Sequence, residues 1–399
     1  MKLFARKVQL VEFSKLVNRN RSDKQQKPKI LFILHMPPPV HGAAMVGKII
    51  KESSLINNDF KGTFINLSTS TEMNEVGKGS GSKLITGIKI AAEVFKALVK
   101  ENYDLCYMTL TAKGFGYYKD FIIVTILKAF RKKIIYHFHN KGVSTRQNQT
   151  IDNLLYKFTF RATKTILLSS LLYYDIAKYV KRKDVFVCAN GVPEFANKTG
   201  NKKTLNGSDR SCKLLFLSNI VVEKGVFVLL EACKLLKEKN LVFECHFVGD
   251  WSNIKEDMFN QLVLENELSN YVFAHGKKYN DDKLVFYRSA DIFVLPSINE
   301  CFPLVLLEAM QFNLPVISTD EGGIADIIVD GETGFIVAKK DSGKLAGKLE
   351  LLIKNADLRL KMGAAGGRRY KDNFTISHFE KGMSTILKEN IYQNRCCPA

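Results

Sequence analysis

The sequence has 399 residues, beyond the roughly 250–300 at which a single hydrophobic core stops growing, so two domains are expected. Hydrophobic residues make up 46% and charged residues 25%, which excludes a disordered, collagenous or disulfide-rich protein. The formal net charge is +19. Residues 1–200 contain 33 lysines and arginines against 14 acidic residues, whereas residues 201–399 contain 26 of each.

This uneven charge predicts different partners for the two halves of the chain. The basic half suits nucleic acid, an anionic membrane surface or a phosphorylated substrate, unless its lysines only form solvated helix faces. The longest nearly apolar run, 121–130, is too short for a membrane-spanning helix, which needs about 20 residues. The start of the chain lacks the apolar core of a signal peptide, and eight scattered cysteines fit a reducing cytosol, so a cytoplasmic location is expected.

Short apolar runs alternate with helical patterns from Lys29 onward, which is typical of doubly wound α/β domains with parallel sheets. A polar stretch at 197–211 interrupts the alternation and marks a domain boundary. The predicted division is a basic lead-in at 1–27, an N-terminal Rossmann-like domain at 28–196, that linker, a C-terminal Rossmann-like domain at 212–375, and a helix with a tail at 376–399. The expected strands are 30–34, 63–67, 105–110, 133–139, 165–169, 184–188, 213–217, 243–248, 271–274, 292–295, 315–318 and 334–337, and the expected helices include 83–100, 118–130, 152–160, 225–239, 256–267, 281–289, 303–312, 323–329, 342–354, 358–373 and 376–392.

The most informative motif is PSINECFPLVLLEAM at 296–310, which follows a predicted strand and opens a helix. Pro is tolerated in the first helical turn, so Phe302-Pro303 sets the helix start. The backbone N–H groups of Leu304 and Val305 then lack helical partners and form an anion site suited to phosphate. Carboxylates beside such a site are suited to accept hydrogen bonds from sugar hydroxyls, so Glu300 and Glu308 are candidate sugar-binding residues.

Together with Gly322-Gly323 and DGETGFIV at 330–337, this E-x7-E element resembles retaining glycosyltransferases of family 4, which have the two-domain GT-B fold. The resemblance covers the chain from Lys29 to about Asn373. It implies that Glu300 contacts hydroxyls of the donor sugar and that Glu308 contacts the nucleotide ribose. Phe302, Pro303, Leu304 and Val305 are then donor-binding residues.

The segment FLSNIVVEKG at 216–225 corresponds to the family's diphosphate-binding element. Lys224 and Gly225 match the family pattern, whereas Asn219 stands where Arg is usual and carries no charge. Lys224 is predicted to stabilise the departing diphosphate, with Asn219 beside it. Gly276 and Lys277 lie where the family's base-binding loop falls, although a glycine after a strand also suits a simple turn.

Three residues of the N-terminal half complete the predicted site. Gly42 follows the first strand and lets the backbone approach a ligand closely, as the family's glycine-rich loop does. His41 beside it is either an acceptor contact or a surface histidine. His139, at the end of the predicted strand KIIYHFH, stands where the family has a histidine against the donor sugar. We therefore expect Gly42 and His41 to bind the acceptor and His139 to serve catalysis with Glu300 and Lys224.

The resemblance implies a retaining, hexosyltransferase-type enzyme that moves a sugar from a nucleotide-sugar donor, with UDP or GDP favoured, to an acceptor hydroxyl. The expected acceptor is a lipid-linked glycan or another glycan in capsule, O-antigen or exopolysaccharide assembly, at an anionic membrane surface. No cofactor and no metal are expected, since Asp-x-Asp is absent. The alternative is a weak or inactive homologue that scaffolds other glycosyltransferases. Nucleic-acid binding is not expected, because no recognisable binding motif occurs.

Overall fold

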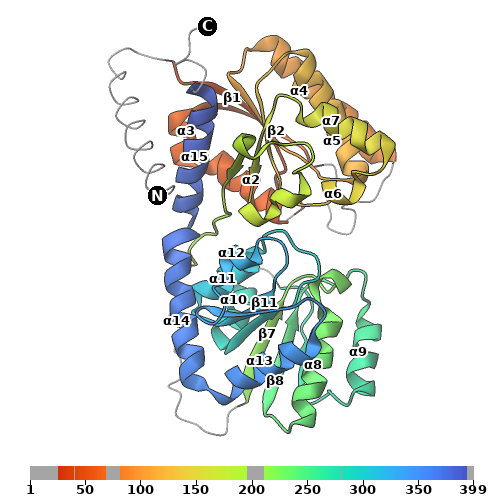
Figure 1. Ribbon diagram of the computed structural model, residues 1–399, viewed down its shortest axis with the longest axis vertical. Coiled ribbons are helices and arrows are strands. Elements are labelled where there is room, and N and C mark those ends of the chain that lie inside the picture. The colour runs from red at the N-terminus through yellow and green to blue at the C-terminus, as the bar shows by residue number, and fades with distance from the viewer. Residues whose placement is uncertain (1–25, 40, 69–80, 196–210, 279, 393–399) are drawn as a thin grey trace.

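The computed structural model describes residues 26–39, 41–68, 81–195, 211–278 and 280–392. These residues form two α/β domains, stacked along the long axis of the molecule, each built on a six-stranded parallel sheet (Figure 1). Most of the predicted lead-in at 1–27 and nearly all of the predicted linker at 197–211 lie outside the described residues. None of the described helices is both long enough and apolar enough to cross a membrane.

The N-terminal sheet has the strand order β2-β1-β3-β4-β5-β6 and is covered on both faces. On one face Leu31 and Ile33 belong to a core that includes helices α4 and α5, and on the other Ile30 and Phe32 pack with helix α2. Burial on both faces explains why the strands are short continuous apolar runs. The elements are β1 (Lys29–Leu34), α2 (Gly42–Glu52), α3 (Ser54–Asp59), β2 (Lys61–Asn66), α4 (Gly81–Lys100), β3 (Leu105–Thr109), α5 (Gly114–Ala129), β4 (Ile134–His137), α6 (Val143–Arg146), α7 (Thr150–Phe160), β5 (Lys164–Leu167) and β6 (Val185–Val187).

The C-terminal sheet repeats this plan with the strand order β12-β11-β10-β7-β8-β9. Its first strand, like β1 in the other sheet, lies inside the sheet, so the chain winds first to one side and then to the other. Such sheets bind ligands at the carboxyl ends of their strands, where the winding reverses. The elements are β7 (Cys212–Leu217), η4 (Val222–Lys224), α8 (Val226–Glu238), β8 (Phe243–Val248), α9 (Glu256–Glu265), β9 (Val272–Ala274), α10 (Asn280–Ser289), β10 (Ile292–Leu295), α11 (Leu304–Gln311), β11 (Val316–Thr319), α12 (Ile324–Ile327), β12 (Gly334–Val337), α13 (Ser342–Lys354) and α14 (Ala356–Asn373).

The last helix, α15 (Ile376–Tyr392), leaves the C-terminal domain and packs on the N-terminal one (Figure 1). Phe379, Met383 and Leu387 are at most 2% exposed and join the core that contains Ile30 and Phe32. The N-terminal domain is therefore completed by a segment from the far end of the chain.

Many predicted boundaries differ from the structure by one or two residues, and the boundaries of β4 and α5 bear on the site. Strand β4 ends at His137 rather than His139, because the chain leaves the sheet there and Asn140 turns back to accept a hydrogen bond from the Ala112 N–H, at 2.9 Å. Helix α5 begins at Gly114, four residues earlier than predicted. Its apolar pattern begins only after the glycines of the first turn, so periodicity alone misses that turn.

Candidate functional site

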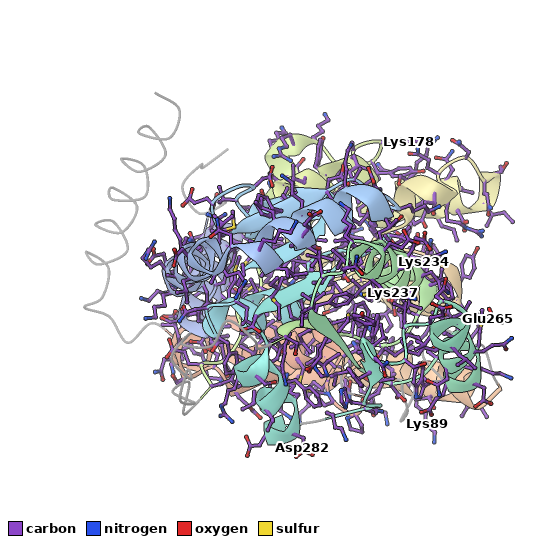
Figure 2. All side chains as sticks on the ribbon, turned by 90° about the horizontal axis from the view of Figure 1, so that it is seen from below. Lys89, Lys178, Lys234, Lys237, Glu265 and Asp282 are labelled. Atoms are coloured by element: carbon purple, nitrogen blue, oxygen red, sulfur yellow. The ribbon has the colours of Figure 1, made fainter. Side chains whose placement is uncertain are left out.

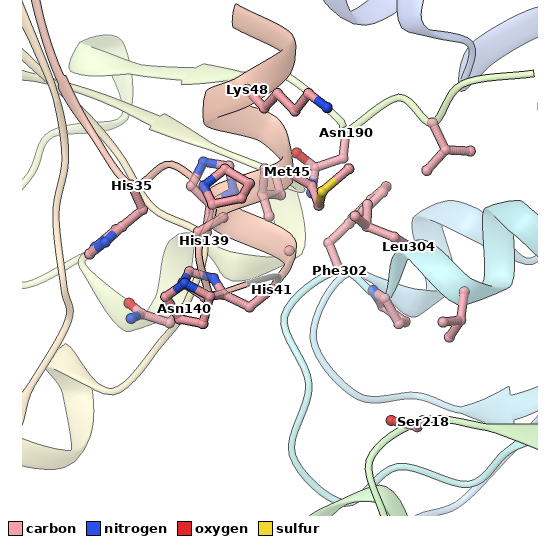
Figure 3. A pocket seen from close by; sticks show the side chains of 18 of the residues that line it. His35, His41, Met45, Lys48, His139, Asn140, Asn190, Ser218, Phe302 and Leu304 are labelled. Atoms are coloured by element: carbon pink, nitrogen blue, oxygen red, sulfur yellow. The ribbon is translucent and has the colours of Figure 1, made fainter. Parts of the chain in front are cut away.

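A cleft of about 1380 Å³ lies between the two domains at the carboxyl ends of both sheets (Figure 3). We call its lining residues from 35 to 195 the N-terminal wall and those from 217 to 308 the C-terminal wall. Ten of the predicted site residues line the cleft. They are His41, Gly42, His139, Lys224, Glu300, Phe302, Pro303, Leu304, Val305 and Glu308.

Asn219, Gly276 and Lys277 are not among the residues that line this cleft. Lys277 forms an ion pair with Asp250 at 2.7 Å, and the Gly276 carbonyl accepts a hydrogen bond from the Gly249 N–H at 3.0 Å. Their donor-binding role therefore stays a prediction.

On the C-terminal wall, Lys224 and Glu300 form an ion pair across 76 residues of sequence. The loops that carry them are pinned together, because the N–H groups of Ile298 and Asn299 both donate to the Glu223 carbonyl, at 2.8 and 3.1 Å. Gly225 makes the close approach possible, since its φ is +79° and a Cβ there would lie 1.9 Å from the Pro296 oxygen. The pair is thus held in place by backbone contacts on both sides.

Glu308 is the second carboxylate of this wall, and it is held from helix α10. The Lys283 ammonium lies 2.8 and 2.9 Å from its two carboxylate oxygens, and the Tyr287 hydroxyl donates to it at 2.8 Å. Burial, and then Glu308 itself, raise the pKa of Tyr287 well above its ordinary value, so this phenol remains a donor. The side chain of Glu308 is 13% exposed, which leaves part of it open to the cleft.

Helix α11 begins at Leu304 between these two carboxylates, in the loop that follows β10. Its cap residue Pro303 offers no side-chain acceptor, so the N–H groups of Leu304 and Val305 have no partner within the helix, whereas the Leu306 N–H donates to the Pro303 carbonyl at 3.2 Å. Leu304 and Val305 both line the cleft. The helix dipole and these amides favour an anion between Glu300 and Glu308.

Three histidines, His35, His41 and His139, line the N-terminal wall (Figure 3). Burial first, and then neighbouring basic groups, lower the pKa of both His35 and His139 to about 3. His41 caps helix α2 by accepting the Ala44 N–H at 3.4 Å, and burial lowers its pKa as well. All three imidazoles are therefore neutral near pH 7.

The two histidines of the predicted strand have different environments. His137 is fully buried, and its Nδ1 lies 2.5 Å from the Tyr107 hydroxyl. His139 packs against it with ring centroids 4.1 Å apart, and its buried Nδ1 has no hydrogen-bond partner among the described residues. Of these two histidines, only His139 lines the cleft.

Several residues that shape the site were not predicted. Lys283 and Tyr287 lie on one face of α10 at i and i+4 spacing, a signal that becomes meaningful only once Glu308 is known to face them. Lys48, Lys113 and Lys119 line the N-terminal wall as well.

Residues 197–369 match the sequence model of the family described as "Glycosyl transferases group 1". The matched residues supply the whole C-terminal wall of the cleft.

Two curated relatives act in polysaccharide biosynthesis by name. The capsular polysaccharide biosynthesis glycosyltransferase CapM of Staphylococcus aureus is 32% identical over 187 residues, which is 44% of this chain and 46% of that protein. The colanic acid biosynthesis glycosyltransferase WcaL of Salmonella typhimurium, a putative assignment, is 26% identical over 235 residues, 56% of each chain. The chain thus spans about half the length of these curated relatives.

Among solved structures, Alr3699/HepE of Anabaena, in complex with UDP and glucose, superimposes with a TM-score of 0.68 at 18% identity. The match covers 90% of this chain and 99% of that one. At this identity the similarity establishes the fold, and it confirms the predicted GT-B arrangement of two Rossmann-like domains.

Proposed function

We propose that this chain is a retaining, metal-independent hexosyltransferase of glycosyltransferase family 4. It transfers a sugar from a nucleotide-sugar donor to an acceptor hydroxyl. The observation that carries the proposal is the paired arrangement of Lys224 with Glu300 and Lys283 with Glu308 on either side of the open N-terminus of α11.

The donor binds along the C-terminal wall in this proposal. Its diphosphate lies at the first turn of α11 beside Lys224, which supplies a positive charge where negative charge develops as the diphosphate leaves. Glu300 accepts hydrogen bonds from hydroxyls of the donor sugar, and Glu308 accepts them from the ribose. Lys283 and Tyr287 hold Glu308 in the orientation that this contact requires.

The acceptor hydroxyl attacks from the N-terminal wall, on the face of the sugar from which the diphosphate departs. A leaving-group oxygen takes the acceptor proton, so no enzymatic base is needed at that step. His139 is neutral and has an unpaired nitrogen, so it contacts the donor sugar without adding a competing charge. Gly42 and His41 line the acceptor side.

The identity of the substrates rests on the relatives and on charge. UDP or GDP is the proposed donor nucleotide, and the UDP complex of the Anabaena structure supports UDP. The relatives named for capsule and colanic acid biosynthesis support a glycan acceptor in polysaccharide assembly, and we propose that this glycan is lipid-linked. The excess of positive charge in residues 1–200 fits such an acceptor at an anionic membrane.

Peripheral membrane association is part of the proposal, and the outer helices of the N-terminal domain support it. Exposed large apolar side chains gather on helices α4, α5 and α7 next to basic residues such as Lys89, which projects from the surface in Figure 2. A surface of this composition suits the headgroup region of an anionic bilayer. The exposed apolar residues of these helices are Ile85, Ile88, Phe95, Val99, Phe115, Tyr118, Ile122, Ile151, Leu154 and Phe158.

The test is a thermal-shift panel of UDP-, GDP-, ADP- and dTDP-linked sugars with purified protein and no added metal. One donor is expected to raise the Tm, and Glu308→Ala is expected to remove the shift, whereas Glu265→Ala on the outer helix α9 leaves it unchanged (Figure 2). A flat panel together with no sugar transfer contradicts the proposal and favours the scaffold alternative.

A further inference from the structure

The two walls of the cleft differ in how their charges are matched. On the C-terminal wall, Lys224 and Lys283 each face a carboxylate of the site. The described residues of the N-terminal wall include three lysines, Lys48, Lys113 and Lys119, and no aspartate or glutamate. A ligand on that wall therefore meets uncompensated positive charge.

The three lysines are not equivalent. Lys119 is 9% exposed, donates to the Leu67 carbonyl at 2.9 Å and lies 3.3 Å from Asp120, so its charge is partly matched. Lys48 and Lys113 are exposed and have no carboxylate partner within the described ranges. Both remain available to an external anion.

The backbone beside Lys113 has the same preference for an anion. Lys113 precedes helix α5, which has 16 residues, no side-chain cap and no acidic residue in its first turn. Gly114, Phe115 and Gly116 of that turn all line the cleft. The stem of Lys113 lies across Gly142, where a Cβ would come within 2.5 Å of its Cδ, so the small residue lets the lysine lie at this helix end.

A buried amide on the same wall independently indicates a ligand. Asn190 is 2% exposed, and its Oδ1 has no hydrogen-bond partner among the described residues although it lines the cleft. In Figure 3 its side chain projects into the space below Lys48 and beside Met45 of α2. A buried acceptor atom without a donor is costly, and a ligand hydroxyl would satisfy it.

We propose that Lys48, Lys113 and the first turn of α5 bind a phosphate or diphosphate group carried by the acceptor, while Asn190 accepts a hydrogen bond from an acceptor hydroxyl. This inference rests on the proposed function, because a donor on the C-terminal wall leaves the N-terminal wall to the acceptor. The proposed site restricts the class of acceptor to molecules that carry a phosphate or diphosphate group. A lipid diphosphate and a free sugar phosphate share this chemistry.

The test measures binding of octyl diphosphate to the full chain by calorimetry. The Lys224→Gln background is used so that the donor diphosphate site contributes little. Adding Lys48→Gln and Lys113→Gln together is expected to weaken binding at least tenfold, whereas Lys178→Gln, at an exposed site of the same domain outside the cleft, leaves it within twofold (Figure 2). Equal affinity with and without the two wall lysines, or no binding of the probe at all, overturns the proposal.

One further measurement distinguishes a lipid-linked phosphate from a free one, and another distinguishes failure of the phosphate site from failure of the proposed transferase function. Octyl diphosphate binding tenfold more tightly than inorganic pyrophosphate identifies a lipid-linked acceptor. Equal lysine-dependent binding of both identifies a free phosphate group and also supports the site. With Lys224 intact, the double variant Lys48→Gln and Lys113→Gln should give the same donor thermal-shift panel as the wild type. If the wild type binds no donor but binds octyl diphosphate through the two lysines, the transferase proposal is refuted and the phosphate site stands.

Discussion

Lys141 and Glu321 form an ion pair that joins the two domains beside the cleft. Glu321 is 3% exposed and also binds Lys339 of its own domain at 2.6 Å. The N–H of Glu300 points to the same carboxylate at 3.5 Å. One buried carboxylate therefore connects the N-terminal domain to the loop that carries the proposed sugar-binding glutamate.

Replacing Lys141 with Met should loosen the contact between the domains and the Glu300 loop together. We expect kcat to fall about tenfold with little change in donor KM, because the donor site itself stays intact while closure aligns the substrates less well. Small-angle scattering should show a larger radius of gyration. Lys141→Arg should restore both values. An unchanged kcat in Lys141→Met would show that the pair has no role in alignment.

Substitutions of the two carboxylates of the C-terminal wall, Glu300 and Glu308, should affect kcat and KM differently. Glu300→Gln is expected to lower kcat by at least a hundredfold while donor affinity changes less than threefold, because its contact strengthens as the sugar reacts. Glu308→Gln is expected to raise the donor KM with a smaller loss of kcat, since its proposed partner is the unreacting ribose. Steady-state kinetics with the identified donor checks both. Indistinguishable profiles for the two variants would contradict the assigned roles.

Two histidines of the N-terminal wall predict a stability that depends on pH. His35 and His139 take up a proton in the folded protein only near pH 3, because burial lowers each pKa from the ordinary value of 6.5. The unfolded chain binds those protons already near pH 6.5. Stability should therefore be lost as pH falls from 6.5 toward 3, by up to about 1.4 kcal/mol per pH unit for each histidine.

Urea unfolding between pH 5 and 7.5 measures this slope. His139→Gln should flatten it, whereas His378→Gln, at an exposed site, should not. A slope that is the same in all three proteins would mean that other groups control the acid sensitivity.

The packing of α15 predicts a stability effect in the other domain. Leu387→Ala should lower the free energy of unfolding by about 2–5 kcal/mol, because its fully buried side chain fills the core beneath β1. Lys381→Ala on the exposed side of the same helix should change it by less than about 0.5 kcal/mol. Hydrogen exchange should place the loss of protection on β1 and α2. A loss confined to α14 would contradict the packing described.

The apolar surface of α7 predicts how the protein binds membranes. Ile151 and Leu154 are 70% and 67% exposed, so changing both to Glu leaves the core untouched. Flotation with vesicles that contain about 30% anionic lipid should recover the wild type and lose most of the double variant. Val242→Glu, at a 65% exposed site in the other domain, is the matched control. Equal recovery of all three proteins would contradict membrane binding through this face.

The alternation of apolar runs and helical patterns predicted every strand within a few residues, because strands buried on both faces must be apolar throughout. The E-x7-E element predicted the C-terminal wall for a similar reason, since its residues lie close together in sequence. The partners of that element could not be predicted. Lys283 meets Glu308, and Glu321 meets the Glu300 N–H, only through tertiary packing. A single lysine on a helix or a single glutamate in a loop has no sequence pattern that would predict such a partner.

Asn190 illustrates the same limit. Its sequence context predicts a turn between the domains that lines the cleft, but not a buried oxygen without a partner. The missing partner of its buried oxygen becomes evident once both walls of the cleft are in place. Burial and hydrogen bonding are properties of the assembled fold, so they are the part of a site that local sequence does not report.

The path of α15 also has a consequence for how the protein is made. The core of the N-terminal domain requires Met383 and Leu387, which leave the ribosome after the whole second domain has been synthesised. Until then Val46 and Ile50 of α2 and Ile56 of α3 lack the apolar partners that α15 supplies. The first domain to emerge is therefore the last to finish folding, and a chaperone that shields these apolar side chains should increase the yield of folded protein.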